Sequence, residues 1–413
     1  MDIVCFSHLR WQFVYQRPNH LMARAARRHR VHFIEEPETG AERAGLRVER
    51  RDGLEVVTPL LPAGLKRSDE LALRRSLLAR HLGHLAATDT WLWYYTPMAL
   101  LWTESVAAAA VVYDCMDELS AFRGAPPGLR RLEKELLARA DVLFTGGRSL
   151  YEAKRSLHPS THLFPSSVDV KHFGRARQAQ PEPADQATIA RPRIGYFGVI
   201  DERLDLDLLT GLAQRRPSWQ IVMVGPLAKL GEADLPRAGN IHWLGLKPYA
   251  ELPAYLAGWD VAIMPFAINE ATRFISPTKT PEYLAGGRPV VSTPVRDVVQ
   301  PYGDAGLVTI APDVEGFVEA VEQALTCDRS LLLRRADQLL ERQSWDRTWS
   351  AMEQLVTAVH RRRLSGAGAP AGWMPEAATV SLSPELAGAA LRSAGSAGGG
   401  STSGPRLTRA RSR

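Results

Sequence analysis

Two side chains of opposite charge, Lys279 and Glu282, lie three positions apart in the most informative stretch of the sequence, residues 276–294. The pattern of this stretch predicts a polar loop and a short helix, with both side chains at the helix start. Free N–H groups and the dipole of a helix N-terminus attract phosphate, and a lysine adds positive charge. A carboxylate nearby can accept two hydrogen bonds from neighbouring sugar hydroxyls. Together the two residues predict a site for a sugar nucleotide.

The limits of this helix follow from residues with known preferences for helix ends. Thr280 is expected to be the N-cap and Pro281 the first helical residue. Gly286 and Gly287 are expected to stop the helix, and a buried strand begins at Pro289. A helix followed by a buried strand is typical of an α/β domain.

The loop before this helix supplies a second cation. Arg273 and Lys279 together would clamp a diphosphate between two positive charges, and Thr278 of the same loop is expected among the binding residues. The alternative is a surface ion pair between Arg273 and Glu270.

Glycines at predicted strand ends give weaker signals in the same half of the chain. In open α/β sheets, ligands bind at the carboxyl ends of the strands. Gly198 would let a phosphate or sugar approach the backbone, Arg203 would pair with a diphosphate, and Gly225 ends the next strand. A plain structural turn explains each glycine equally well. The backbone after Trp243 would suit a planar base, although core packing is the simpler reading of this tryptophan.

The first half of the chain lacks the motifs of several large enzyme classes. It has no Gly-x-Gly-x-x-Gly, Walker A, His-Glu-x-x-His or Gly-x-Ser-x-Gly pattern, which disfavours dehydrogenases, kinases and serine hydrolases. Polar residues do follow its predicted strands. Among them, Asp117 or His8 is a candidate contact for an acceptor hydroxyl, the alternative being loop capping.

Strand patterns alternate with helix patterns along the chain, which predicts two doubly wound parallel sheets of the α/β class. Residues 175–191 lack an apolar period and are expected to be a linker, and a long amphipathic helix is expected over 345–363. Residues 364–413, rich in Ala, Gly, Ser and Pro, are expected to be a disordered tail. The strands are expected at residues 3–7, 31–35, 90–95, 111–115, 142–145, 162–165, 193–198, 220–225, 241–244, 260–266, 289–292 and 306–311.

Composition excludes other classes. The net charge of +6 is modest, and half of it comes from five arginines against two glutamates after Leu364, so no nucleic-acid partner is expected. No apolar run of about 18 residues and no signal peptide is present, which favours a cytoplasmic protein. Cys5, Cys115 and Cys327 lack metal or redox spacing; buried structural thiols are expected, and no metal site is predicted.

Several blocks of the sequence resemble those of a known protein family. Gly195-Tyr-Phe-Gly198, Val222-Met-Val-Gly-Pro, Asn240-Ile-His-Trp-Leu-Gly and the block from Pro277 to Val291 resemble the retaining GT-B glycosyltransferases of the "glycosyl transferases group 1" kind. Trp11-Gln-Phe-Val-Tyr-Gln-Arg-Pro-Asn-His-Leu is similar to a subgroup related to the teichuronic acid biosynthesis glycosyltransferases. The resemblance covers residues 1–363.

The resemblance implies two Rossmann-like domains that face a cleft. Residues 1–174 would hold the acceptor, residues 192–344 would bind the sugar nucleotide, and the helix over 345–363 would pack back on the first domain. Glu282 matches the family's ribose-binding glutamate. Phe274 stands where the family has a glutamate for the donor sugar, with Glu270 nearby as a substitute. Val199 stands where the family has a diphosphate-binding arginine, so Arg203, Arg273 or Lys279 would supply that charge.

The expected activity is transfer of a sugar, with retention, from a nucleotide diphosphate sugar to a cell-envelope glycan or lipid-linked acceptor. Arg203, Lys279 and Asp117 are the expected catalytic residues, and no cofactor beyond the donor is expected to be required. With such acceptors, the protein could also contact the inner face of the cell membrane peripherally. The alternatives are a non-catalytic sugar-nucleotide-binding protein and a sugar-nucleotide epimerase of the same fold.

Overall fold

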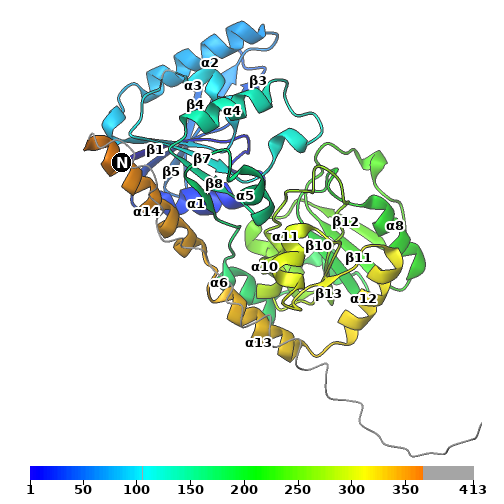
Figure 1. Cartoon of the computed structure of the whole chain (residues 1–413). Helices are drawn as coiled ribbons and strands as arrows, with labels where there is room; N and C mark the ends of the chain where they lie inside the picture. The colour runs from blue at the N-terminus through cyan, green and yellow to red at the C-terminus, as the bar shows by residue number, and fades with distance from the viewer. Residues whose placement is uncertain (105, 366–413) are drawn as a thin grey trace, which may run out of the picture. The chain divides into compact units, whose positions relative to one another are not determined.

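The computed structural model of the chain describes residues 1–104 and 106–365 (Figure 1). Within these residues the first half forms a nine-stranded sheet in the order β3-β5-β2-β1-β6-β7-β8-β9, with β4 antiparallel to β5 and the other pairs parallel. Its strands are β1 (Asp2–Phe6), β2 (Arg30–Ile34), β3 (Glu38–Thr39), β4 (Gly45–Arg51), β5 (Leu54–Leu61), β6 (Thr90–Tyr94), β7 (Ala110–Cys115), β8 (Val142–Thr145) and β9 (Thr161–Leu163).

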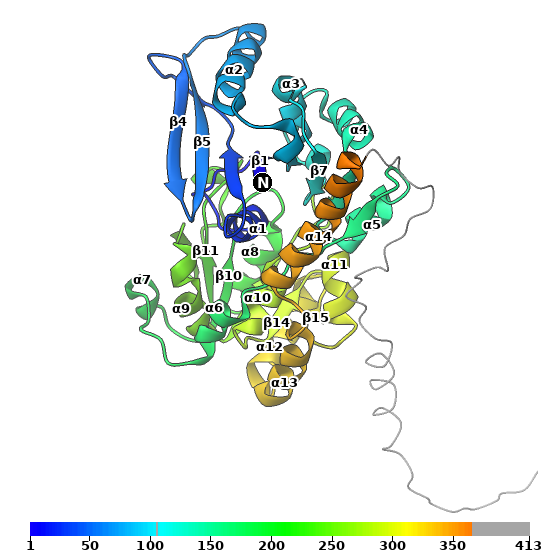
Figure 2. The same ribbon diagram turned by 90° about the vertical axis from the view of Figure 1, so that its left-hand side faces the viewer.

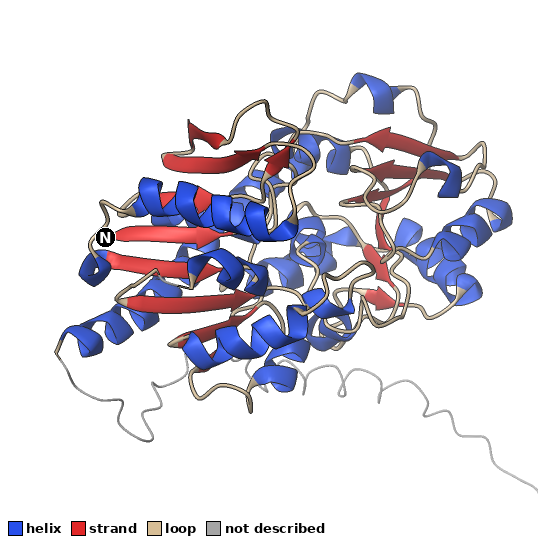
Figure 3. Ribbon diagram, turned by 90° about the horizontal axis from the view of Figure 1, so that it is seen from above, coloured by secondary structure: helices blue, strands red, loops and turns tan. Residues whose placement is uncertain are grey.

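The second half forms a six-stranded parallel sheet in the order β12-β11-β10-β13-β14-β15. Figure 3 shows the two sets of strands with helices flanking each. The strands are β10 (Arg193–Phe197), β11 (Gln220–Val224), β12 (Ile241–Gly245), β13 (Val261–Met264), β14 (Val290–Ser292) and β15 (Thr309–Ile310). The predicted α/β class with two doubly wound sheets is confirmed.

Helices connect the strands as the alternation predicts. In the first half they are α1 (Arg17–Ala25), α2 (Arg67–Leu82), α3 (Leu100–Thr103), α4 (Leu129–Arg139) and α5 (Arg148–Lys154). In the second half they are α8 (Leu206–Arg215), α9 (Leu252–Ala257), α10 (Lys279–Ala285), α11 (Arg296–Val298), α12 (Val314–Thr326) and α13 (Arg329–Leu340). Across the described residues no helix combines the length and apolar character needed to span a membrane.

A buried ion pair fixes α1 against the first sheet. The Nε atom of Arg17 donates to both carboxylate oxygens of Asp114, at 3.0 and 3.1 Å, and a second guanidinium nitrogen donates to the carbonyl oxygen of Phe164. Both charged side chains are almost fully buried. Removing one partner would leave an unpaired buried charge, which typically costs about 3–5 kcal/mol. Arg17 and Asp114 therefore have a structural role.

The last described helix, α14 (Trp345–Leu364), packs on the first sheet although it follows the second in sequence (Figure 2). Trp349, Met352 and Val356 belong to the same buried cluster as Trp91 and Trp93 of β6. The two ends of the described chain therefore share one hydrophobic core.

The segment expected to be a linker is packed against the second half. It continues from α6 (Val170–Gly174) and contains α7 (Ala184–Ala187). The Gln186 side chain is fully buried; it accepts a hydrogen bond from Trp259 Nε1 at 2.8 Å and donates to the Tyr255 carbonyl oxygen. Polar side chains with specific partners hold this segment, and an apolar period does not reveal such contacts.

Other sequence expectations need correction. Helix α10 begins at Lys279 with Thr278 as its N-cap, so the expected cap at Thr280 is wrong. Thr280 instead lies buried and its hydroxyl donates to the sulfur of Met264. Cys327 is exposed, whereas Cys5 and Cys115 are buried as expected. The tail expected over 364–413 lies outside the described residues from position 366 onward.

Candidate active site

Lys279 lies at the carboxyl end of β10, against the glycine that ends this strand. A Cβ atom on Gly198 would collide with Cε of Lys279 and would lie 2.6 Å from its Nζ. The Nζ atom also lies 5.7 Å from the centre of the Tyr196 ring. Gly198, at φ +145°, thus makes room for the lysine to cross the strand end.

The first turn of α10 pairs Lys279 with Glu282, which is 7% exposed. Burial raises the pKa of Glu282 and lowers the pKa of Lys279, while the attraction between the two opposes both shifts. The Thr278 side chain hydrogen-bonds Glu282. At the other side of the helix, the Tyr283 hydroxyl accepts a hydrogen bond from the Phe197 backbone N–H at 2.9 Å. Helix α10 is therefore fastened directly to the end of β10.

Arg203 is held in a fork by Asp201, two residues before it. Its Nε donates to Oδ1 at 2.9 Å, and a second guanidinium nitrogen donates to Oδ2 at 2.8 Å. Burial acts to lower the pKa of Arg203, but the hydrogen bonds and charge of Asp201 outweigh it and raise the pKa. A planar guanidinium fixed in this way presents its remaining N–H groups in a set direction.

Asp117 brings a carboxylate from the first half to these cations. It follows β7 and is half-buried. Burial raises the pKa of the Asp117 carboxyl to about 6, although Arg203 and Lys279 both attract its ionised form. The structure therefore brings together Asp117, Arg203, Lys279 and Glu282, which come from three separate segments of the sequence.

A loop of the first half rests on the loop that carries Arg203. The Phe122 ring lies with its centre 5.7 Å from the Arg203 guanidinium and 4.9 Å from Lys229 Nζ. The backbone N–H of Arg123 donates to Glu202 Oε1 at 3.0 Å. These contacts cover one side of Arg203 and shield it from water.

The two predicted glycines serve the packing of loops against one another. Gly225 has φ +149°, and a Cβ atom there would collide with the carbonyl oxygen of Gly198. The tight contact between these two strand ends agrees with the structural alternative. Beyond Gly225, a cavity of about 400 Å³ lies beside Ile200, Trp243 and Gly245. Trp243 is partly buried on the core, and its indole N–H donates to the Pro236 carbonyl oxygen at 3.3 Å.

Arg273 stands apart from this cluster. Its guanidinium pairs with Glu270 at 3.6 Å, and both side chains are well exposed. It also lies 5.2 Å from the Phe274 ring centre. Among the described residues the structure gives Arg273 no contact with Lys279, in agreement with the surface-pair alternative.

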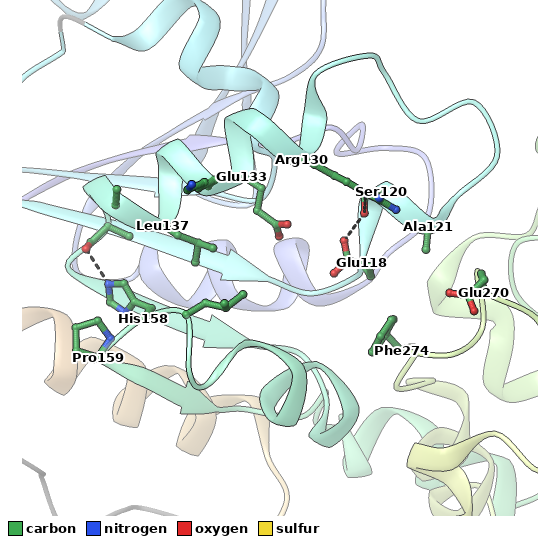
Figure 4. A pocket seen from close by; sticks show the side chains of 14 residues that line it. Glu118, Ser120, Ala121, Arg130, Glu133, Leu137, His158, Pro159, Glu270 and Phe274 are labelled. Atoms are coloured by element: carbon green, nitrogen blue, oxygen red, sulfur yellow. Dashed lines mark hydrogen bonds between the residues drawn. The ribbon is translucent and has the colours of Figure 1, made fainter.

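Phe274 and Glu270 line a cavity of about 1010 Å³ whose other walls come from the first half (Figure 4). Phe274 packs against the apolar cluster of that half. Across the cavity, Glu118 and Glu133 both hold Lys154 Nζ at 2.7 Å. The lining also contains the basic residues Arg130 and Lys134, so charges of both signs surround the opening. His8, the other candidate acceptor contact, lies in the loop after β1, and burial lowers its pKa to about 4, which keeps it neutral.

Sequence reasoning missed two residues that orient the cluster. These are Asp201 and Tyr283, neither of which the sequence analysis singled out. The ion pair of Arg203 joins residues only two positions apart. An aspartate so close to an arginine in a loop is the sequence signal that could have revealed it. No local sequence pattern predicts the hydrogen bond between the Tyr283 hydroxyl and β10, because Tyr283 and β10 are distant in the sequence.

Comparison with known proteins identifies the second half. Residues 191–327 match the model of the family described as Glycosyl transferases group 1. This segment is therefore similar to the glycosyl transferases group 1 family. The matched segment contains Gly198, Arg203, Lys279 and Glu282, and the predicted resemblance is confirmed.

One curated relative extends the similarity. The protein TuaH of Bacillus subtilis (strain 168), provisionally named a teichuronic acid biosynthesis glycosyltransferase, is 28% identical over 220 residues. The match covers 49% of this chain and 55% of TuaH, so the chain spans about half the length of this relative.

Solved structures share the fold. Sucrose-phosphate synthase from Thermosynechococcus elongatus aligns with a TM-score of 0.65 at 16% identity, over 89% of this chain and 100% of that one. An alpha,alpha-trehalose-phosphate synthase (UDP-forming) from Burkholderia xenovorans, in complex with glucose-6-phosphate, aligns with a TM-score of 0.63 at 14% identity, over 86% of this chain and 99% of its own. The chain has the GT-B fold of these structures, as predicted from the sequence.

Proposed function

We propose that this protein is a glycosyltransferase that moves a sugar from a nucleotide diphosphate sugar to a cell-envelope glycan or glycolipid acceptor, with retained configuration. The observation that carries the proposal is the convergence of Arg203, Lys279 and Glu282 at the end of β10 inside the group 1 domain. Retention and the kind of acceptor rest on the resemblance to retaining GT-B enzymes and on the name of the TuaH relative.

The chemical task of the donor side is to stabilise the additional negative charge that develops on the diphosphate as its bond to the sugar breaks. Arg203 and Lys279 are the two cations that meet there, and Asp201 holds the first of them in place. Preorganised positive charge and N–H donors of this kind lower the barrier because they need no rearrangement as charge develops. Glu282 then accepts hydrogen bonds from the ribose hydroxyls. The cavity beside Trp243 holds the base.

The acceptor side belongs to the first half. Asp117, with a pKa of about 6, is mostly ionised at neutral pH and can accept a hydrogen bond from an acceptor hydroxyl. The cavity lined by Glu118, Glu133 and Phe274 opens beside it and offers space for a glycan. Glu270, which lines the same cavity, lies four residues before Phe274, the family's donor-sugar position.

Binding measurements test the donor role of Glu282. A thermal-shift screen of the wild type against nucleoside diphosphate sugars selects a donor, and calorimetry then compares the wild type with Glu282→Ala. We expect at least tenfold weaker donor binding in this variant, because two ribose hydrogen bonds are lost. Glu319→Ala, an exposed acid on α12 of the same half, is the matched control. Equal affinity of the wild type and Glu282→Ala would contradict the ribose role.

Product analysis tests the reaction itself. With donor and a mixture of envelope glycans and glycolipids, we expect release of the nucleoside diphosphate and a glycosylated product of retained configuration. Conversion of the donor alone would point to an epimerase. Donor binding without turnover on any acceptor would point to a non-catalytic binding protein.

A further inference from the structure

Three potential metal ligands converge in the first half, away from the proposed active site. His32 on β2, Glu55 on β5 and His81 on α2 each present a ligand atom, and these atoms all lie within 4.8 Å of one another. His32 Nδ1 lies 3.0 Å from Glu55 Oε2, and His81 Nε2 lies 4.0 Å from the same oxygen. Figure 2 shows α2 beside β4 and β5, so the helix brings its histidine to the sheet.

The sheet itself fixes two of the three ligands. His32 and Glu55 are direct partners in the parallel register of β2 and β5, so their side chains stand on the same face. Helix α2 covers that face and carries His81 in its last turn. The ligands are far apart in the sequence, which is why spacing motifs do not reveal them.

Unsatisfied nitrogen atoms point to a missing partner. His32 is 4% exposed, yet neither of its ring nitrogens makes a hydrogen bond among the described residues. His81 Nε2 is buried in the same condition. Carboxylate oxygens lie 3.0–4.0 Å from these nitrogens without forming hydrogen bonds to them, and an ion held between the groups would explain this arrangement.

We propose that His32, Glu55 and His81 bind a divalent transition metal ion, with zinc as the best match. Two imidazoles and one carboxylate are the ligand types that zinc takes, whereas calcium and magnesium prefer oxygen alone. Tetrahedral zinc with bonds of about 2.1 Å needs ligand atoms about 3.4 Å apart. The observed separations bracket this value, so small side-chain movements close the site. The ring centre of His84 lies 6.4 Å from that of His32.

Asp2 lies next to the His32 ring, on the side opposite Glu55. Its Oδ1 lies 3.6 Å from His32 Nε2, the nitrogen that faces away from Glu55. A carboxylate behind a metal-binding histidine fixes the ring orientation and increases its basicity. Arg30 pairs with the same carboxylate at 2.7 Å and holds it in position.

The position of the cluster indicates a structural ion. Asp2 is the first residue of β1 and Glu55 the second of β5, so the cluster lies toward the amino ends of the strands. Asp117 follows the carboxyl end of β7, at the opposite edge of the same sheet. An ion here would fasten α2 to the sheet and take no part in the transfer reaction.

Metal titration of the full chain tests the proposal. Protein without a histidine tag is stripped with EDTA, dialysed, and titrated with zinc chloride by calorimetry. We expect one zinc ion per chain, a higher melting temperature with zinc, and the visible absorption of four-coordinate cobalt when Co²⁺ replaces it. Asp2→Asn should weaken zinc binding about 10–100-fold. His81→Ala and Glu55→Gln should weaken it at least 100-fold.

The control is His242→Ala, which removes a histidine of β12 that is hydrogen-bonded to Gln220 at 2.7 Å. Its zinc stoichiometry and affinity should equal those of the wild type. Circular dichroism of each stripped variant separates loss of a ligand from loss of the fold. Absence of saturable zinc and cobalt binding by the wild type, or unchanged affinity in both His81→Ala and Glu55→Gln, would overturn the proposal.

Discussion

The side chain of Lys279 fills the space that a Cβ atom on Gly198 would require. One residue ends β10 and the other begins α10, and the contact exists only because the first has no side chain. The position of the amine is therefore set by a residue type on a different segment of the chain.

Gly198→Ala should displace Lys279 and weaken donor binding at least tenfold. The φ of +145° also strains any other residue, at about 1–3 kcal/mol, so the melting temperature should fall as well. Calorimetry with the donor found by the thermal-shift screen measures the first effect. Gly239→Ala, where a Cβ atom meets nothing within 4 Å, should change neither property. Wild-type donor affinity in Gly198→Ala would show that the lysine is not part of the donor site.

The Asp201–Arg203 ion pair should contribute more to the free energy of unfolding than an ion pair at the surface does. We expect Asp201→Ala to reduce the free energy of unfolding by about 1–2 kcal/mol, because Arg203 loses its charged partner in a half-buried setting. The double variant with Arg203→Ala should recover part of this loss in a urea-denaturation cycle. The exposed Glu270–Arg273 pair, treated in the same way, should couple by less than about 0.5 kcal/mol. Equal coupling in the two pairs would contradict the special role of Asp201.

Asp117 should make stability depend on pH. Its pKa in the folded chain, about 6, lies above the ordinary value of 3.8, so its contribution to stability is fully present below pH 3.8 and is lost as the pH rises through 6. At pH 8 the buried carboxylate is ionised and unfavourable. Asp117→Asn should therefore raise stability at pH 8 by about 1 kcal/mol, and by much less at pH 4.5. Melting curves at both pH values measure this, with the exposed Asp304→Asn as control; an equal gain at both would contradict the shifted pKa.

Met352 tests the packing of α14. It is fully buried in the cluster of the first half, so Met352→Ala should cost about 3 kcal/mol through the cavity it leaves. Leu364→Ala, at a side chain 59% exposed on the same helix, should cost less than about 0.5 kcal/mol. Urea denaturation followed by tryptophan fluorescence compares them. A small effect at Met352 would mean that α14 is not part of this core.

The sequence predicted the fold well where apolar residues run in short buried strands. Residues 220–225 and 142–145, for example, match β11 and β8 closely. The β4–β5 hairpin was missed although Asp52-Gly53, both with positive φ, is a strong turn signal between its strands. Helix α2 was missed because four of its sixteen residues are buried, so its apolar pattern is weak.

The candidate site was predicted as a set of residue types, and the structure adds their grouping. Lys279, Glu282 and Arg203 carried local signals in strand-end loops. Asp117 was one of several polar residues at strand ends, and only the fold shows that its charge faces Arg203 rather than solvent. Arg273 had the same signal as Lys279 but points to Glu270, because its side chain lies on the outer side of the loop.

The shared core of the chain ends has a consequence for protein synthesis. A ribosome releases Trp91 and Trp93 long before Trp349 and Met352, which complete their cluster. Among the described residues, the core of the second sheet is built from residues between Val168 and Leu340, which emerge before α14. Although domains usually fold in the order in which they are made, here the half that is translated second can finish first. The nascent first half must wait, with aromatic surface uncovered, for the last helix to arrive.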